Sequence, residues 1–317
     1  MGPITVVEFE YHAGAQRRLV SVTSRVLAIY VMAVLLVELP FVLQIQKHST
    51  SFTNFLQTAS VQSIKLPQLN LSPHVKAAST VSMSASEVSA SNAALTKLID
   101  NFAHAHSGSF KVAAIDTANP KHSVSYGGDD AMITASTYKM FAAYAALSKV
   151  EQGSLSLSTP TANGTLDHCI QRMILVSDND CGQAVSDKVG WTEMTRVSNA
   201  AGFVNTSLDG TRGGNQYSTA NDEAQFMYRL QSGRLLNAEH TQYLMDLMKR
   251  QILRSGIPAG TNGSVVANKV GNLGTVHADM AVVYSPNSTY VLVIMTDGSS
   301  VAAIKDLSQQ IYKFYNP

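Results

Sequence analysis

The sequence predicts an α+β fold in which a helical subdomain lies beside an antiparallel sheet, preceded by a transmembrane helix. A segment with helical spacing and two short β-rich runs open the body of the chain, and helical segments fill its middle. Three β-rich runs and a last helix then close it. Strands grouped at the two ends, with helices between them, are typical of a mixed fold with an antiparallel sheet.

The transmembrane helix is predicted at residues 26–46, which read VLAIYVMAVLLVELPFVLQIQ. At 1.5 Å per residue, a helix of this length can cross a hydrocarbon core of roughly 30 Å. Arg17, Arg18 and Arg25 precede the segment, and this bias favours a cytoplasmic N-terminus at 1–25 with the remainder outside. A cleaved signal peptide and a buried soluble helix remain alternatives.

The next segment, residues 47–91, is rich in Ser, Thr and Ala and contains Pro67 and Pro73. Because such a segment has little apolar surface to bury, we expect a flexible stalk. The folded domain is expected to span residues 92–317, with Asn92 capping its first helix.

Local patterns place the elements of the domain in order. Helices are expected at 93–105, 136–150, 166–176, 181–189, 222–231, 238–251 and 301–315. Strands are expected at 110–115, 123–126, 265–270, 278–284 and 290–296, the first two joined by a turn at 119–122.

Composition excludes several classes of function. The chain is 45% apolar and 14% charged, with a formal net charge of +1. This is a globular composition without the basic footprint of a nucleic-acid-binding protein. The sequence contains neither His-Glu-x-x-His nor paired Cys-x-x-Cys, so we expect no metal site and no cofactor.

Three short motifs carry the chemistry. Ser136 and Lys139 stand three residues apart at the start of a helix, where they share one face, so that the amine can reach the hydroxyl and act as its base. Ser177-Asp178-Asn179 follows a later helix, and Lys269-Val270-Gly271 lies on the first strand of the C-terminal trio. Each motif is common by itself, but the three in this order and setting are not expected by chance.

With these motifs, residues 92–315 resemble the class A β-lactamases and the related penicillin-binding proteins. The resemblance implies a serine hydrolase with a helical subdomain beside a five-stranded antiparallel sheet flanked by helices. It implies that Ser136 is the acylated nucleophile, Lys139 its base, and Ser177 the group that passes a proton to the leaving amine.

The same resemblance implies the residues that bind substrate. Asn179 would bind the substrate amide and Lys269 its carboxylate end. The oxyanion hole would consist of the backbone N–H of Ser136 and of Asn272, the residue that follows Gly271.

The chain departs from the family both in a loop and within one of the motifs. Residues 205–216, NTSLDGTRGGNQ, lack the glutamate that activates the deacylating water, and Asp209 is their only acid. Asp209 could replace it, although an ordinary turn aspartate before glycine is the simpler interpretation. Val270 stands where the family has Thr or Ser, whose hydroxyl helps to bind the substrate carboxylate. Either Thr275, His277 or Arg212 supplies an alternative contact, or the substrate has no carboxylate there.

These observations predict a serine hydrolase that opens β-lactam amide bonds and deacylates slowly. The alternatives are a D-Ala-D-Ala carboxypeptidase acting on peptidoglycan stem peptides, or a catalytically silent wall-binding module. The expected location is the bacterial cytoplasmic membrane, with a single span and an extracytoplasmic catalytic domain. For such a location, Cys169 and Cys181 form either a disulfide or two buried thiols.

Overall fold

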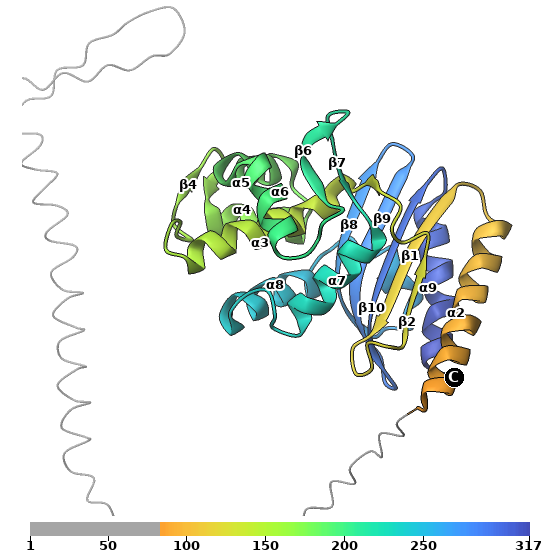
Figure 1. Ribbon diagram of the computed structural model, residues 1–317. Helices are drawn as coiled ribbons and strands as arrows, with labels where there is room; N and C mark the ends of the chain where they lie inside the picture. Colours follow the sequence, from red (N-terminus) through yellow and green to blue (C-terminus); the bar gives the residue numbers. More distant parts are fainter. Residues whose placement is uncertain (1–82) are drawn as a thin grey trace, which may run out of the picture. The chain divides into compact units, whose positions relative to one another are not determined.

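A five-stranded antiparallel sheet forms the centre of the domain in the computed structural model, which describes residues 83–317 (Figure 1). The strands lie in the order β2-β1-β10-β9-β8. Their bounds are Ser109–Asp116 for β1, Ser123–Tyr126 for β2, Val265–Leu273 for β8, Val276–Tyr284 for β9 and Thr289–Asp297 for β10. Since β1 pairs with β10, the first and last parts of the domain lie side by side. The predicted sheet is confirmed.

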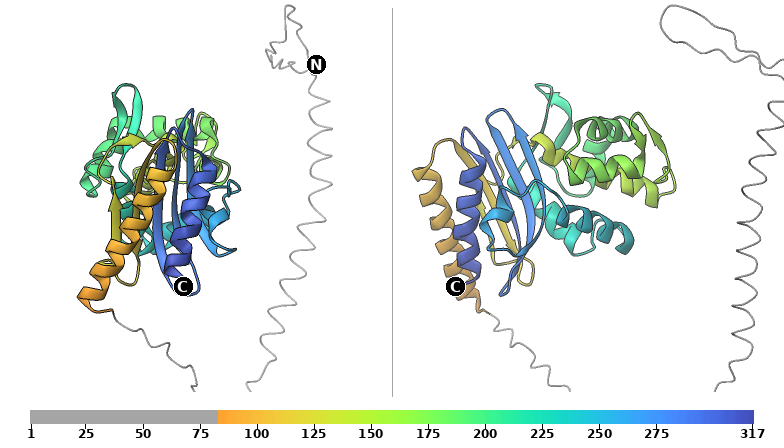
Figure 2. Two further views of the ribbon diagram at one scale, coloured as in Figure 1. Left: turned by 90° about the vertical axis from the view of Figure 1, so that its right-hand side faces the viewer. Right: turned by 180° about the vertical axis from the view of Figure 1, so that it is seen from behind.

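Two helices, α2 (Ala85–Ala105) and α9 (Val301–Tyr315), cover one face of this sheet (Figures 1 and 2). Their apolar stripes bury Ile99, Leu307 and Ile311 completely. Burying a side chain of this size stabilises the fold by about 1.5–3 kcal/mol. The other face of the sheet is also covered, so side chains on both faces of the central strands are buried. The sequences of these strands are therefore nearly continuous apolar runs.

The opposite face carries the helical part of the domain (Figure 1). Helix α7 (Ala220–Gln231) packs on β1, β9 and β10. The other helices of this part are α3 (Tyr138–Glu151), α4 (Leu166–Leu175), α5 (Asn179–Val189), α6 (Trp191–Ala200) and α8 (Ala238–Lys249). A short 3-10 turn, η1 (Ala135–Thr137), precedes α3 and contacts β8 and β9. The start of α3 is therefore held at the edge of the sheet.

Helix α2 begins earlier than the sequence predicts. Ser84 rather than Asn92 is its N-cap, and Ser84 and Glu87 form a reciprocal capping box. Residues 85–91 are therefore helical and are not part of a stalk. The predicted anchor at 26–46 and residues 47–82 of the predicted stalk lie outside the described residues. Within 83–317, no helix is long and apolar enough to span a membrane.

A hairpin occupies the glycine-rich segment in which Asp209 is the only acidic residue. It consists of β6 (Ser207–Arg212) and β7 (Asn215–Ser218), and β7 also pairs with the short strand β3 (Met132–Ile133). The link continues at Thr134, whose N–H donates to the carbonyl of Gln216. The hairpin is thus joined to the segment that leads directly into η1.

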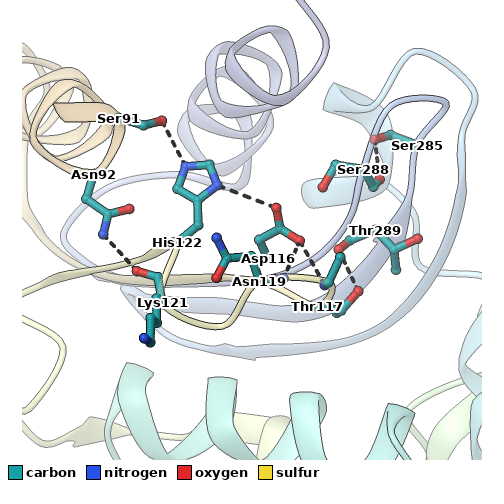
Figure 3. Close-up of polar contacts among 11 residues, drawn as sticks. Ser91, Asn92, Asp116, Thr117, Asn119, Lys121, His122, Ser285, Ser288 and Thr289 are labelled. Carbon is teal, nitrogen blue, oxygen red and sulfur yellow. Dashed lines mark hydrogen bonds and ion pairs between the residues drawn. The ribbon is translucent and has the colours of Figure 1, made fainter. Parts of the chain in front are cut away.

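A polar cluster fastens α2 to the turn between β1 and β2 (Figure 3). His122 Nε2 lies 2.9 Å from Ser91 Oγ, and His122 Nδ1 lies 3.4 Å from Asp116 Oδ2. These residue types match those of a catalytic triad. However, Ser91 lies inside a helix, so its own N–H is engaged there and cannot bind an oxyanion. We interpret the cluster as a structural contact.

Candidate active site

Ser136 lies in the η1 turn, between strand β3 and helix α3. The preceding residue, Ala135, has a positive φ of 45°. A residue with a Cβ adopts this conformation only when the surrounding structure holds it there. The fold therefore holds an unfavourable backbone conformation at the residue directly before the serine, and such conformations are enriched at functional sites.

Lys139 lies in the first turn of α3 and is completely buried. Its Nζ lies 3.1 Å from Ser136 Oγ, 2.7 Å from the Ser177 carbonyl oxygen and 2.7 Å from Asn179 Oδ1. The carbonyl and the amide oxygen can only accept hydrogen bonds. A neutral amine would donate its two hydrogens to them, which leaves its lone pair for the proton of the Ser136 hydroxyl.

The environment of Lys139 shifts its protonation equilibrium toward that neutral form. Burial lowers the pKa of Lys139 to about 8, although the negative charge of Asp178 opposes the shift. Glycine at position 182 makes room for the amine, since a Cβ there would lie 2.6 Å from Lys139 Cε. The sequence motifs do not mark Gly182, because it lies on the neighbouring helix α5 and meets Lys139 only in the folded domain.

Ser177 and Lys269 form the second half of the site. Lys269 Nζ donates to Ser177 Oγ at 2.9 Å and to the Val270 carbonyl at 2.6 Å. Ser177 has a positive φ of 57°, and Asp178 caps the N-terminus of α5, so the loop that carries Ser177 is firmly placed. Burial, and then the positive charge of Lys139, lower the pKa of Lys269 well below its ordinary value.

Strand β8 touches the η1 turn at Gly271. A Cβ on this residue would lie 2.5 Å from the Thr134 carbonyl oxygen and 3.0 Å from Ser136 N. Only glycine permits this approach, which brings the two predicted oxyanion donors, the N–H groups of Ser136 and Asn272, onto adjoining backbones. Asn272 also holds His277, whose Nδ1 is 2.7 Å from Asn272 Oδ1.

The structure thus brings together the predicted residues Ser136, Lys139, Ser177, Asn179 and Lys269 in one hydrogen-bonded group, with Gly271 against the nucleophile turn. Within the described part of the chain, no group of three or more His, Cys, Asp or Glu side chains could hold a metal ion. The hydroxyl and amine groups brought together here are suited to proton transfer and nucleophilic attack.

Asp209 is engaged inside its own hairpin. Its Oδ1 accepts hydrogen bonds from the Thr211 hydroxyl at 2.7 Å and from the Ser207 hydroxyl at 3.2 Å. The Thr211 hydrogen bond lowers the pKa of Asp209, even though burial opposes it. A carboxylate stabilised in this way is a weak base, which favours the interpretation of Asp209 as a turn residue.

Val270, the departure in the Lys-x-Gly motif, lines a small cavity of about 80 Å³ together with Leu253, Asn272 and Asp279. Of the side chains that could replace the missing hydroxyl, Thr275 donates a hydrogen bond to Asp297 Oδ1.

Cys169 and Cys181, for which the sequence left open a disulfide or two thiols, are free thiols whose buried sulfur atoms lie 2.7 Å apart.

Glu223, on α7, also belongs to the surroundings of the site. It is completely buried, and its Oε1 lies 2.5 Å from the hydroxyl of Thr137, the residue after the serine. Sequence reasoning missed it, although an acidic residue within the apolar face formed by Ala220, Ala224 and Met227 was a usable signal.

Comparisons with known proteins agree with this fold. The family model described as "Beta-lactamase enzyme family" matches residues 94–315. Among solved structures, PBP-A gives a TM-score of 0.64 at 21% identity, over 70% of this chain and 96% of that chain. A PBP-A mutant described as an acyl-enzyme complex with penicillin G gives 0.65 at 21% identity, over 71% and 97%. A β-lactamase from Sphaerobacter thermophilus gives 0.61 at 20% identity, over 74% and 98%.

At these identities the solved structures establish the likeness of the fold. None of the curated proteins compared matches the sequence.

Proposed function

Because the chain belongs to the beta-lactamase enzyme family and is a serine hydrolase, we propose that it opens β-lactam amide bonds through an acyl-enzyme on Ser136. The observation that carries the proposal is the position of the buried Lys139 amine, 3.1 Å from Ser136 Oγ. A serine hydroxyl becomes a useful nucleophile only when a neighbouring base removes its proton. Lys139 is that base, and its lowered pKa makes the neutral amine far more abundant near neutral pH than it is for an ordinary lysine.

Acylation then follows in two steps. Ser136 Oγ attacks the carbonyl carbon while its proton moves to Lys139, and the N–H groups of Ser136 and Asn272 stabilise the oxyanion. Loss of one such donor typically costs about 2.7–4 kcal/mol of transition-state stabilisation. Ser177 passes its hydroxyl proton to the departing nitrogen and takes a replacement from the Lys269 ammonium, which donates to Ser177 Oγ at 2.9 Å. Before this transfer, the charged Lys269 holds the anionic end of the substrate.

Release of the acyl group is proposed to be slow. The hairpin that replaces the family's glutamate-bearing loop offers only Asp209, which is engaged by Ser207 and Thr211. Without a positioned general base, the attack of water typically loses about 10²–10⁴ in rate. A penicillin acyl-enzyme has been solved for a mutant of the structurally similar PBP-A, which supports penicillin as the probe.

A D-Ala-D-Ala carboxypeptidase acting on peptidoglycan stem peptides is the second candidate, because the missing deacylation glutamate favours it. Both activities use the same nucleophile, base and oxyanion donors. A catalytically silent wall-binding module is disfavoured, since binding alone does not require a buried lysine beside a serine.

The proposed location is the outer side of a bacterial cytoplasmic membrane, with residues 26–46 as the anchor. Arg17, Arg18 and Arg25 on the N-terminal side support this orientation. Protease added to intact protoplasts should remove the catalytic domain, and full protection of the domain would reverse the orientation.

The kinetic test mixes the purified domain with penicillin G and follows the opening of the β-lactam ring. The proposal predicts a rapid burst equal to the enzyme concentration, followed by slow turnover. Sustained fast turnover would contradict slow deacylation. The absence of a burst, together with cleavage of a D-Ala-D-Ala peptide, would favour the carboxypeptidase. Ser136→Ala serves as the control and should show no burst.

A further inference from the structure

The hydroxyl of Thr137, directly after the nucleophile, has two partners. Its Oγ1 lies 2.8 Å from the carbonyl oxygen of Thr134 and 2.5 Å from Oε1 of Glu223. A hydroxyl has a single proton to donate. A carbonyl oxygen has none, so the Thr137 proton belongs to the bond with Thr134. The bond between Thr137 and Glu223 then needs its proton from the carboxyl group, which makes Glu223 a neutral acid.

The other carboxyl oxygen supports this assignment. Oε2 of Glu223 is buried and has no hydrogen-bond partner among residues 83–317. An ionised carboxylate carries charge on both oxygens, and a buried, unpartnered charge is costly. In the neutral acid, Oε2 is the carbonyl oxygen, for which the missing partner matters much less.

The charged groups around Glu223 come from three elements. The carboxylates of Asp222 on α7 and Asp279 on β9 disfavour a negative charge on Glu223, whereas the ammonium group of Lys269 on β8 favours it. Burial is the largest effect, and it raises the pKa of Glu223 to about 8. The acid is therefore mostly protonated at neutral pH.

We propose that neutral Glu223 is a positioning residue that holds the nucleophile turn in its reactive shape. The chain of hydrogen bonds from Glu223 through Thr137 to Thr134 ties helix α7 to the turn on both sides of Ser136. That turn contains Ala135 with its positive φ, a conformation that persists only while neighbouring contacts hold it. This inference rests on the proposed role of Ser136 as nucleophile.

Ionisation of Glu223 should release the turn. A carboxylate can only accept, so it competes with the Thr134 carbonyl for the Thr137 proton, and one of the two bonds is lost. Acylation should therefore rise as Lys139 loses its proton and fall again as Glu223 loses its own, which gives a bell-shaped pH profile.

Glu223→Gln separates the acidic rise of the pH profile from its alkaline fall, because an amide can donate a hydrogen bond to Thr137 and does not ionise. We expect this variant to acylate with penicillin G at nearly the wild-type rate at neutral pH and to lose the alkaline fall. Glu223→Leu and Thr137→Val should acylate about tenfold or more slowly, because the turn is no longer held. Thr137→Ser keeps the hydroxyl and should acylate at the wild-type rate. Glu239→Gln, the same change at an exposed position of α8, should also behave as wild type.

An alkaline fall in Glu223→Gln equal to that of wild type, or wild-type acylation by a folded Glu223→Leu, would overturn the proposal. Infrared difference spectra of wild type against Glu223→Gln test the proton itself, and a protonated carboxyl band should be present at neutral pH and vanish at alkaline pH. If that band is absent at neutral pH, the proposal is wrong.

A second probe separates this proposal from the proposed function. Phenylboronic acid adds to an activated serine without any amide bond, so its affinity reports the shape of the turn even if penicillin is not a substrate. Weaker binding by Glu223→Leu, with rescue in Glu223→Gln, is expected. Equal affinity in all three proteins would refute the positioning role.

Discussion

Gly271→Ala tests the close contact between strand β8 and the nucleophile turn. The added Cβ would lie 2.5 Å from the Thr134 carbonyl oxygen, whereas ordinary contacts begin at 3.4 Å, so the two backbones must separate by about 0.9 Å. The same atom would lie 3.0 Å from Ser136 N, so the oxyanion donor moves with the turn.

A displacement of about 1 Å in a catalytic group can cost about 10²-fold in rate, equivalent to about 2.7 kcal/mol of activation free energy. We therefore expect Gly271→Ala to acylate with penicillin about a hundredfold more slowly than wild type. The overpacking should also lower the free energy of unfolding by about 1–3 kcal/mol. Stopped-flow acylation and thermal unfolding measure the two effects.

Val265→Ala is the matched control, because it changes an exposed side chain on the same strand. It should leave the acylation rate unchanged. If folded Gly271→Ala acylates as fast as wild type, the contact at Gly271 does not position the oxyanion donors and the reasoning is refuted.

Three further predictions concern the lysine and the cysteines. Since the pKa of Lys139 is lowered to about 8, acylation should rise about tenfold per pH unit below that value, and a flat profile there would exclude Lys139 as the base. Gly182→Ala should displace the Lys139 amine and slow acylation by at least about tenfold without unfolding the domain, and an unchanged rate would show that the contact is relieved elsewhere. Mild oxidation should join Cys169 and Cys181 and stabilise the domain by about 3 kcal/mol, whereas thiol titration that still finds both free would disprove the pairing.

The parts of the fold that the sequence predicts well are those with strong local patterns. Strands β9 and β10 are long apolar runs, and α9 has a clear apolar stripe, so the sequence predicts the bounds of each to within a few residues. Local patterns do not predict helix α6, because its sequence, WTEMTRVSNA, is mostly polar and buries only Met194 and Ser198. The start of α2 was misplaced because the capping box at Ser84 and Glu87 lies within a serine-rich stretch.

The candidate site shows the same division. Ser136, Lys139 and Lys269 could be predicted because their spacing along the chain is the motif itself. Glu223 could not be placed from spacing, because its contact with Thr137 depends on how α7 packs against the sheet. Contacts between distant segments follow from tertiary packing, which local patterns do not encode.

Intact mass spectrometry of the domain after mixing with penicillin G tests the central claim most directly, because it reports acylation, its site and its lifetime. We predict one long-lived penicilloyl adduct, mapped to the peptide that contains Ser136, absent in Ser136→Ala and nearly absent in Lys139→Ala. An unmodified wild-type mass at every time point, or an adduct that persists in Ser136→Ala, would contradict the account.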